Sequence, residues 1–458
     1  MTETSSSEPA FERKNLFQLA WPLFLFSALS IGATFVDQMI LSAYQQNLAA
    51  AVSLGNQVLG VAYDLSGLLA IGGLVLVAQC LGRGDTPGAR RIGGISIAVN
   101  TLLNVAISLV LFIGASSFVG WVDTPAELVA DTTSYVRVIG VAMILNGFIT
   151  VAASVLRAFG HTIEILVFGI VGNVIYLALE YAMVFGRWGF PEMGVQGASL
   201  STLIVRIAGA AMFAWALTRR LGFSAGWAGM GRLWHGLRDR EAIRRLFHLS
   251  VPGASDNFAY NLFQLTMVKF VASLGTSAVL VRSYTLTINA LLSLVVVAVT
   301  QANETLIGYD KGAEDHATAR RRAVRTTIGT ALAVMVLSGV LYAFAEPLTR
   351  LFTQDEAVIR GVKTLLLAGI ALEPFAAGIV ILLGSLRSVG DAVVPVVFSI
   401  AVTWLLGAPL AWYLMKHTGL GVTGLWIALA IAECVKCTGL FVRWQRMKWA
   451  ARPALVTS

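Results

Sequence analysis

The sequence predicts an all-α polytopic membrane protein with twelve transmembrane helices in two pseudo-symmetric six-helix lobes. Hydrophobic residues make up 57% of the 458 residues and charged residues only 13%, which lies outside the range of soluble globular domains. Long apolar runs alternate with short polar breaks over almost the whole sequence, as expected for membrane-spanning helices. The second half of the sequence also repeats the first.

The repeat consists of short motifs that recur about 230 residues apart. The matching pairs are residues 16–22 with 246–252, 82–85 with 312–315, 156–160 with 386–390, and 194–197 with 421–424. Each half would contain six spans, so the two halves should cross the membrane in the same direction. An axis along the membrane normal would then relate them, as in transporters built from parallel repeats.

The spacing of the apolar runs gives the expected order of elements. The spans centre near residues 28, 65, 105, 142, 174, 206, 258, 292, 333, 370, 403 and 431. We therefore predict a cytoplasmic tail (1–14), an N-terminal lobe (15–219), a cytoplasmic linker (220–243), a C-terminal lobe (244–443) and a second cytoplasmic tail (444–458). The linker is basic and contains Trp and Gly, and a helix lying on the membrane surface is one interpretation of it.

The net charge of +8 is explained by topology. Most Lys and Arg residues fall in loops on one side of the predicted membrane, so the positive-inside rule places both termini in the cytoplasm. We expect the lipid bilayer as a partner and no nucleic acid. The polar, Ser-rich start and the long first apolar run argue against a cleaved signal peptide.

Cysteine and histidine are too sparse to predict a metal site. The chain has three Cys and five His residues, and none of the histidines has ligand spacing to another. Cys434 and Cys437 lie in an apolar span without a second pair. We therefore predict no disulfide framework, no metal centre and no cofactor.

Two acids in the first half are candidates for ion coupling. Asp37 and Glu180 both lie in the outer parts of spans that begin inside, so their carboxylates can share a depth in the membrane. A charge at a helix centre costs roughly 2.5–3.5 kcal/mol on insertion scales. Two carboxylates facing one cavity would repel each other and favour binding of a proton. The alternative is that each acid pairs with a buried base, Arg137 or Arg206, and only fixes packing.

The second half carries acids and bases within its spans, and two interpretations remain open. The acids are Asp256, Glu304 and Glu373, and the bases are Lys269 and Arg282. They could form a neutralised structural network. Alternatively, the acids form a second site for a cation or a substrate.

Aromatic side chains are candidates for lining a cavity that takes flat, lipophilic cations. Those proposed here are Phe35, Tyr63, Phe258 and Tyr284. Taken singly, each of them is better explained by helix packing or contact with lipid.

Several motifs resemble the multidrug and toxic compound extrusion (MATE) family. They are Pro22 followed by Asp37 in the first span, and the segments 78–85, 156–160 and 180–198. The resemblance covers nearly the whole chain and implies a monomeric transporter, not an enzyme, in the cell membrane. Such a protein exports amphiphilic, often cationic organic compounds by alternating access, in exchange for H⁺ or Na⁺. It further implies Asp37 as the coupling acid, Glu180 as its partner and Pro22 as a hinge.

The sequence departs from the family pattern at three positions. Glu180 replaces a frequent Asp, and Tyr176 lies where an Asn is common one turn earlier. Tyr260 lies where one branch carries an acid, so the chain looks more like the branch that is coupled through first-lobe acids and includes the DNA-damage-inducible (DinF-type) members. For this chain we expect H⁺ rather than Na⁺ as the coupling ion. One alternative is a lipid-linked oligosaccharide flippase of the same superfamily. Another is a multi-span membrane enzyme, which would need catalytic clusters that the sequence does not show.

Overall fold

The computed structural model describes residues 14–122, 124–223 and 238–447, and every regular element in these ranges is a helix. The predicted surface helix of the linker and nearly all of both predicted tails fall outside the described residues. The first half contains α1 (Leu16–Tyr44), α2 (Gln46–Ser66), α3 (Leu68–Gly82), α4 (Thr86–Trp121), α5 (Val129–Ala158), α6 (Thr162–Val184) and α7 (Val195–Leu221). The second contains α9 (Arg240–Ala272), α10 (Thr276–Gly312), α11 (His316–Ala343), α12 (Ala345–Arg350), α13 (Glu356–Ser388), α14 (Val393–Val402), the π-helical turn η1 (Thr403–Gly407), α15 (Ala408–His417) and α16 (Val422–Arg446).

The chain divides into two compact units, with the boundary between Leu246 and Phe247. In the described part of the chain, eleven helical stretches are long and apolar enough to cross a membrane. The helix α9 is also long enough, with 33 residues, but it is more polar because its first turns are rich in charge. We call the unit of α1–α7 the first lobe and the unit that begins within α9 the second lobe.

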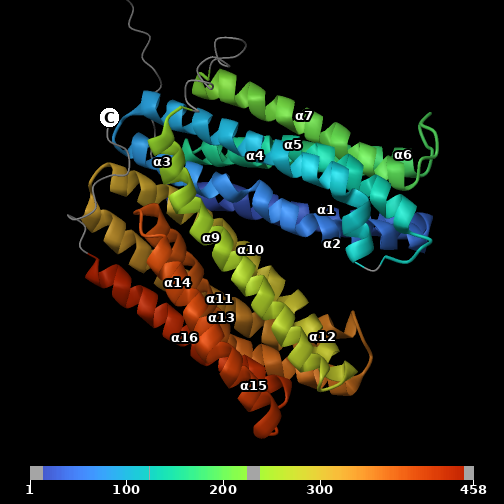
Figure 1. Ribbon diagram of the computed structural model, residues 1–458. Coiled ribbons are helices and arrows are strands. Elements are labelled where there is room, and N and C mark those ends of the chain that lie inside the picture. The colour runs from blue at the N-terminus through green and yellow to red at the C-terminus, as the bar shows by residue number, and fades with distance from the viewer. Residues whose placement is uncertain (1–13, 123, 224–237, 448–458) are drawn as a thin grey trace, which may run out of the picture. The chain divides into compact units, whose positions relative to one another are not determined.

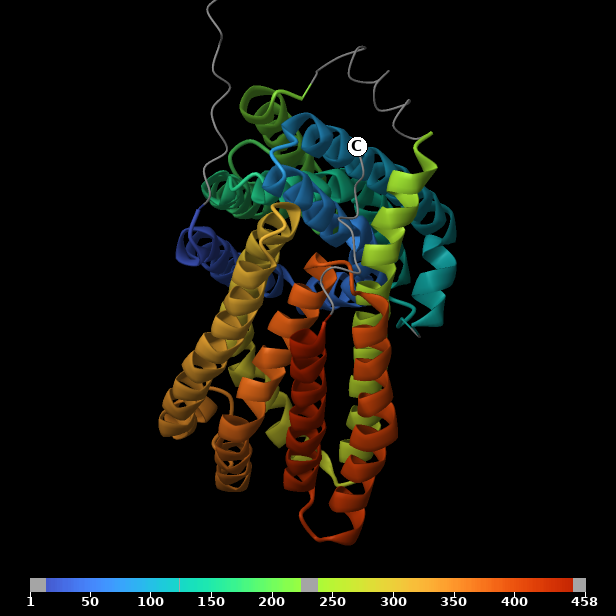
Figure 2. The ribbon, with the colours of Figure 1, turned by 90° about the vertical axis from the view of Figure 1, so that its left-hand side faces the viewer.

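Each lobe is built around the fourth span of its half. In the first lobe, α5 packs against α2, α3, α4 and α7, and the long helices run alongside one another (Figure 1). In the second lobe, α13 packs against α10, α11 and α16, again with the helices roughly aligned (Figure 2). Both central helices end in one of the repeated motifs, at 156–160 and 386–390. The sequence repeat is therefore also a repeat of packing.

Another repeated motif places a helix cap at the same point of each lobe. The Asp85 carboxylate accepts a hydrogen bond from the backbone N–H of Gly88 at 2.8 Å, at the start of α4. Asp315 accepts in the same way from Thr318 at 3.0 Å, at the start of α11. An N-cap aspartate satisfies a backbone donor that the helix leaves free. The recurrence of these two acids therefore has a local structural cause.

Two predicted spans are interrupted. The second span breaks at Gly67 into α2 and α3, and the freed carbonyl of Ser66 accepts hydrogen bonds from Asn100 at 2.9 Å and Asn104 at 3.3 Å. Asn146 donates to the Ser66 hydroxyl at 2.9 Å. In the second lobe, η1 divides the predicted eleventh span between α14 and α15. Such π-helical turns are frequent at functional sites.

Candidate functional site

The two predicted coupling acids meet at one tyrosine in the first lobe. The Tyr176 hydroxyl lies 2.5 Å from Asp37 Oδ1 and 3.3 Å from Glu180 Oε1. The two carboxyl groups are also within hydrogen-bonding reach of each other. Glu180 is fully buried and Asp37 is half-buried. The structure thus brings together the two acids that the sequence singled out.

The spacing along α6 explains this geometry. Tyr176 and Glu180 are four residues apart, so they share one face of the helix, and Asn173 lies three residues before Tyr176 on the same face. The helix α1, which carries Asp37, packs along α6. The Asn173 amide nitrogen is buried without a hydrogen-bond partner. The sequence identified Tyr176 only as a departure from the family pattern, and its contact with both acids was not expected.

The charge of this acid pair is not neutralised by a base. Among the described residues, neither Asp37 nor Glu180 has a basic side chain among its hydrogen-bond or electrostatic partners. Arg137 is exposed and Arg206 is half-buried, so the alternative in which either pairs with these acids finds no support here. Glu180 Oε2 is buried and lacks a hydrogen-bond donor. Since one hydroxyl can donate only one proton, a bound proton would satisfy this oxygen.

A second tyrosine lies close to the acid pair. Tyr135 on α5 donates to Asn56 at 3.1 Å and is near enough to Asp37, Glu180 and Tyr63 to interact with them electrostatically. The predicted cavity residue Tyr63 is therefore in the neighbourhood of the site. Phe35, another of the aromatic residues predicted to line a cavity, is 61% exposed.

The helix α1 is held mainly at its ends. Its buried side chains, Leu19, Ala20, Pro22, Leu23 and Leu41, all lie near one end or the other. At its N-terminal end, Lys14 donates to the carbonyl of Gly160 at 2.8 Å. At its C-terminal end, Tyr44 donates to Glu192 at 2.6 Å.

Proline explains one of the contacts near the N-terminal end of α1. Pro22 has no N–H to offer the carbonyl of Gln18, and this carbonyl instead accepts from the Thr162 hydroxyl of α6 at 3.5 Å. The interruption in the backbone ladder therefore sits beside the start of α6. This places a weak point in α1 about four turns before Asp37.

The predicted acids of the second lobe separate into two places. Glu304 is buried and pairs with Arg387, whose Nη2 lies 2.5 Å from Glu304 Oε1. Gly384 makes room for this pair, because a Cβ there would come within 2.5 Å of Glu304 Oε1. The base that neutralises Glu304 is thus Arg387, and not Lys269 or Arg282. Glu304 is not among the residues that line the cavity of this lobe.

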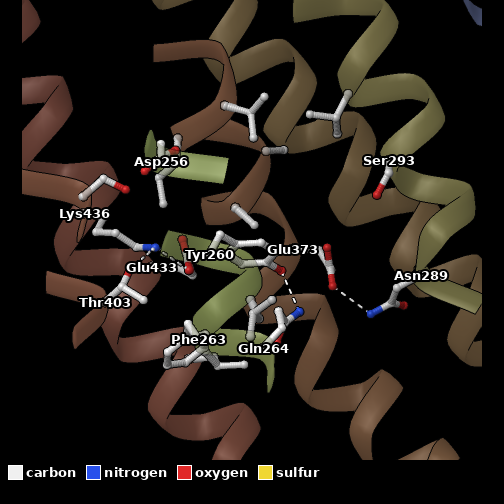
Figure 3. A pocket seen from close by; sticks show the side chains of 18 of the residues that line it. Asp256, Tyr260, Phe263, Gln264, Asn289, Ser293, Glu373, Thr403, Glu433 and Lys436 are labelled. Atoms are coloured by element: carbon white, nitrogen blue, oxygen red, sulfur yellow. Dashed lines mark hydrogen bonds and ion pairs between the residues drawn. The ribbon is translucent and has the colours of Figure 1, made fainter. Parts of the chain in front are cut away.

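The other two acids, Asp256 and Glu373, line a cavity of about 380 Å³ in the second lobe (Figure 3). Glu433 and Lys436 form an ion pair at 2.7 Å on the same side as Asp256, and Lys436 also donates to Thr403 of η1 at 3.2 Å. On the other side, Asn289 donates to Glu373 at 2.7 Å.

The aromatic walls of this cavity differ from those proposed. They are formed by Tyr260, Phe263, Trp404 and Trp426. Phe258 is 67% exposed and does not line the cavity, and Tyr284 stacks on Phe352 with ring centroids 5.3 Å apart. Within the described residues, no three His, Cys, Asp or Glu side chains gather closely enough to hold a metal ion.

The chain is similar to proteins that are named as transporters and to a solved transporter structure. It is 29% identical over 449 residues to a protein named uncharacterized transporter YisQ from Bacillus subtilis (strain 168), covering 97% of both chains. It is 23% identical over 444 residues to a probable multidrug resistance protein NorM from Thermotoga maritima, covering 97% of this chain and 94% of the relative. The crystal structure of the Vibrio cholerae MATE transporter VcmN in the bent form has a TM-score of 0.85 at 20% identity, covering 96% of this chain and 98% of that one. The predicted all-α, two-lobe transmembrane fold is confirmed.

The MatE family model matches residues 22–182 and 252–413. The two matches begin at Pro22 and Pro252, the same residues that align the sequence repeat. Together they cover most of the chain and both lobes. The alternative of a multi-span enzyme is thereby dropped, whereas placement in the DinF-type branch stays a prediction. This chain belongs to the MatE family of membrane transporters.

Proposed function

We propose that this chain is a proton-coupled antiporter that exports amphiphilic, often cationic organic compounds by alternating access. The observation that carries the proposal is the acid pair of half-buried Asp37 and buried Glu180, which shares the Tyr176 hydroxyl and has no basic partner among the described residues. The export of drugs is supported by the relatives named multidrug resistance protein. Ionisable residues inside a membrane that lack a partner commonly mark ion pathways.

The local geometry favours a proton over Na⁺. Sodium sites in transporters commonly use carbonyls of unwound helices, whereas α1 and α6 continue as helices past the acid pair. The phenol of Tyr176 presents a donor to the carboxylates, and a donor opposes a metal cation at the same oxygens. The acceptor Glu180 Oε2 has no donor and lies near a second carboxyl group. A single proton could form a hydrogen bond between the carboxyl groups of Asp37 and Glu180.

Proton binding would change the charge of the site and thereby the packing of α1. In the loaded state one proton lies between the carboxyl groups and the pair carries one negative charge. In the empty state the pair carries two negative charges, and the Tyr176 hydroxyl is the donor that faces them. One proton that moves down 100 mV supplies about 2.3 kcal/mol, which supports roughly a 50-fold gradient of a neutral substrate. The exchange of proton for substrate would then drive the alternation between outward and inward openings.

Pro22 is the proposed hinge in this cycle. The middle of α1 contributes few buried side chains, and Pro22 interrupts its backbone hydrogen bonds near the inner end. The relative VcmN has been crystallised in a form described as bent. Protonation of Asp37 would change the relative populations of two shapes of α1 that differ by a bend at Pro22.

The proposed orientation in the membrane follows from the charge distribution. Both termini are in the cytoplasm, because the basic loops lie on that side. The protein acts as a monomer in the bilayer and requires no cofactor and no nucleic acid. A lipid-linked oligosaccharide flippase is the second candidate, and the experiment below separates the two.

The test is transport of ethidium by purified protein in proteoliposomes. Ethidium carries a permanent charge, so a pH gradient does not trap it without a transporter. We expect ethidium to accumulate in vesicles with an acidic lumen, and not in vesicles with a Na⁺-rich lumen at equal pH. Protein-free vesicles are the control. Accumulation driven by Na⁺ alone would overturn proton coupling, and no accumulation with either ion would favour the flippase.

A further inference from the structure

Basic side chains from three helix ends lie close together in the first lobe. Lys14, just before α1, donates to the carbonyl of Gly160 at 2.8 Å. The Nδ1 atom of the next residue, His161, lies 2.9 Å from the Glu164 carboxylate near the start of α6. Arg220, in the last turn of α7, lies 4.0 Å from the same carboxylate. We call Lys14, His161, Glu164 and Arg220 the basic cluster.

The basic cluster carries more positive than negative charge. Among the described residues, the partner of Lys14 is a neutral carbonyl, and two of its three N–H donors remain available. Glu164 is the one acid of the cluster, and His161 and Arg220 share it. The Arg220 side chain is 55% exposed, and its distance of 4.0 Å from Glu164 is too long for a hydrogen bond. Two permanent bases and one acid leave at least one positive charge that an anion can neutralise.

The second lobe supplies an acid of its own at the equivalent place. The duplicated motifs 156–160 and 386–390 are followed by His161 in the first lobe and by Asp391 in the second. Asp391 accepts two hydrogen bonds from Arg443, at 2.7 and 3.0 Å. Arg443 lies in the last turn of α16, the last helix of its lobe, as Arg220 does in α7. The first lobe therefore keeps the base but has a histidine in place of its acid.

An exposed apolar stripe begins next to the basic cluster. Its residues follow one another at intervals of three or four on α6, so they share one face of the helix, and each is at least 41% exposed. They are Ile163, Val167, Ile170 and Val174. The stripe extends over about 16 Å, because an α-helix rises 1.5 Å per residue. This length matches the hydrocarbon thickness of one leaflet, which is about 15 Å.

Tryptophans lie near the basic cluster on both neighbouring helices. Trp215 is 52% exposed and precedes Arg220 by little more than one turn of α7. Trp21 is 36% exposed and follows Lys14 by about two turns. Tryptophan is enriched where the hydrocarbon of a membrane meets the lipid headgroups. This level suits a headgroup at the basic cluster and an acyl chain along the stripe.

We propose that the basic cluster and the stripe together bind one anionic phospholipid. The lipid phosphate accepts hydrogen bonds from Lys14 and Arg220, and an acyl chain lies along the exposed face of α6. Anionic lipids attract clusters of Lys and Arg at the membrane surface, which gives the ligand its class. The lipid would lie beside the contact of Thr162 with Gln18 and would stabilise the N-terminal anchor of α1. This inference goes beyond the proposed function, because it assigns a binding site outside the acid pair.

The experiment compares three ligands that contain a phosphate group but differ in net charge or in acyl chains. They are dioleoyl phosphatidylglycerol, which is anionic, dioleoyl phosphatidylcholine, which is zwitterionic, and glycerol phosphate, which has no acyl chain. Binding to the full-length protein in detergent is measured by native mass spectrometry. We expect phosphatidylglycerol to bind at least about tenfold more tightly than either of the others.

A crosslinking lipid then gives the location of the site. The probe is a phosphatidylglycerol with a photoactivatable diazirine in its acyl chain, and it is mixed into liposomes that contain the full-length protein. We expect most crosslinked peptides to include the stripe, between Ile163 and Val174.

Variants assign the charges. Lys14→Gln and Arg220→Gln should each lower the preference for phosphatidylglycerol by about threefold, and the double variant should remove most of it. His161→Asp keeps both bases but adds the acid that the second lobe has at this position, so it should also remove most of the preference. Arg220→Lys keeps the charge and should retain the preference. Arg91→Gln is the matched control, because Arg91 is a 67% exposed base of the same lobe that pairs with Asp239 at 2.8 Å.

Four results overturn the inference. They are equal affinity for the two lipids, equally tight binding of glycerol phosphate, an unchanged preference in the double variant, and crosslinks that lie outside residues 163–174. None of these measurements uses an ion gradient or a transported compound. A failure of proton-driven ethidium transport is therefore distinguishable from a failure of this inference.

Discussion

The two lobes share one helical plan but place their charges at different points of it. The residue that lies 230 positions after Asp37 is Met267, which is fully buried in the apolar core of the second lobe. The residue that lies 230 positions before Glu373 is Met143, which is 1% exposed in the core of the first lobe. Each lobe thus carries an acid where the other carries a buried methionine.

The surroundings of these acids also differ. In the first lobe, Asp37 and Glu180 contact the Tyr176 phenol and, within the described part of the chain, no base. In the second, Glu304 is paired with Arg387 and Glu433 with Lys436. Buried charges are retained in membrane proteins when they are paired or functional. The comparison supports our proposal that the first lobe binds and releases an ion, whereas the ion pairs of the second lobe neutralise its buried charges.

Replacement of Asp37 should have the largest effect on transport. Asp37→Asn keeps the size of the side chain but removes the group that gains and loses a proton, so we expect accumulation of ethidium driven by an acidic lumen to be lost. Asp64→Asn is the matched control, because Asp64 is an exposed acid on α2. Equal transport by Asp37→Asn and the wild-type protein would remove the assigned role of the first lobe.

The second lobe should respond to charge removal by a loss of stability. Arg387→Ala leaves Glu304 buried without its base, which costs about 3–5 kcal/mol of the free energy of unfolding. The change is measured by unfolding in detergent with increasing denaturant. Arg360→Ala, an exposed residue of the same helix α13, should change it by less than about 0.5 kcal/mol. A similar small change in Arg387→Ala would show that the pair is not structural.

A smaller effect on transport is expected at Tyr176 of the first lobe. Tyr176→Phe removes the hydroxyl that stabilises the proton-free acids, and we expect proton-driven transport to slow about tenfold. Tyr181→Phe serves as the control, because Tyr181 is 40% exposed on the same helix. Initial rates of ethidium uptake provide the measurement. If both variants transport at the wild-type rate, the acids do not depend on this phenol.

The smallest effect is expected at the hinge. Pro22→Ala restores a backbone donor towards the carbonyl of Gln18 and stiffens α1, so transport should slow by about threefold. The same substitution at Pro252 tests whether the two lobes differ here as well. Unaltered transport in Pro22→Ala would contradict only the hinge role of Pro22. The role proposed for Asp37 and Glu180 would be unaffected.

Local patterns predicted much of this structure. Apolar runs located the spans, and the repeat predicted that both halves have the same plan. The interruptions of the α-helix within two spans, at Gly67 and at η1, were not predicted. Their hydrogen bonds come from side chains on other helices, as with Asn100 on α4, and apolar content alone carries no sign of them.

The candidate sites were predicted in part. Asp37 and Glu180 stand out because a charge in an apolar run is costly. Their common partner Tyr176 does not stand out, since a tyrosine in a membrane helix has many ordinary uses. For the same reason the sequence assigned Glu304 and Glu373 to one set, although only Glu373 lines the cavity. Which base neutralises which acid depends on contacts between helices far apart in the sequence.

The sequence by itself determined the class of this protein, its duplication and the acids that lie in the membrane. These properties follow from the free energy of placing each residue type in lipid, which is local and additive along a helix. The tertiary structure alone decided that Asp37 meets Glu180 at Tyr176, that Glu304 pairs with Arg387, and that Arg282 faces a cavity with Glu373. Such pairings depend on the rotation and depth of neighbouring helices, because a charge interacts strongly only over a few ångströms.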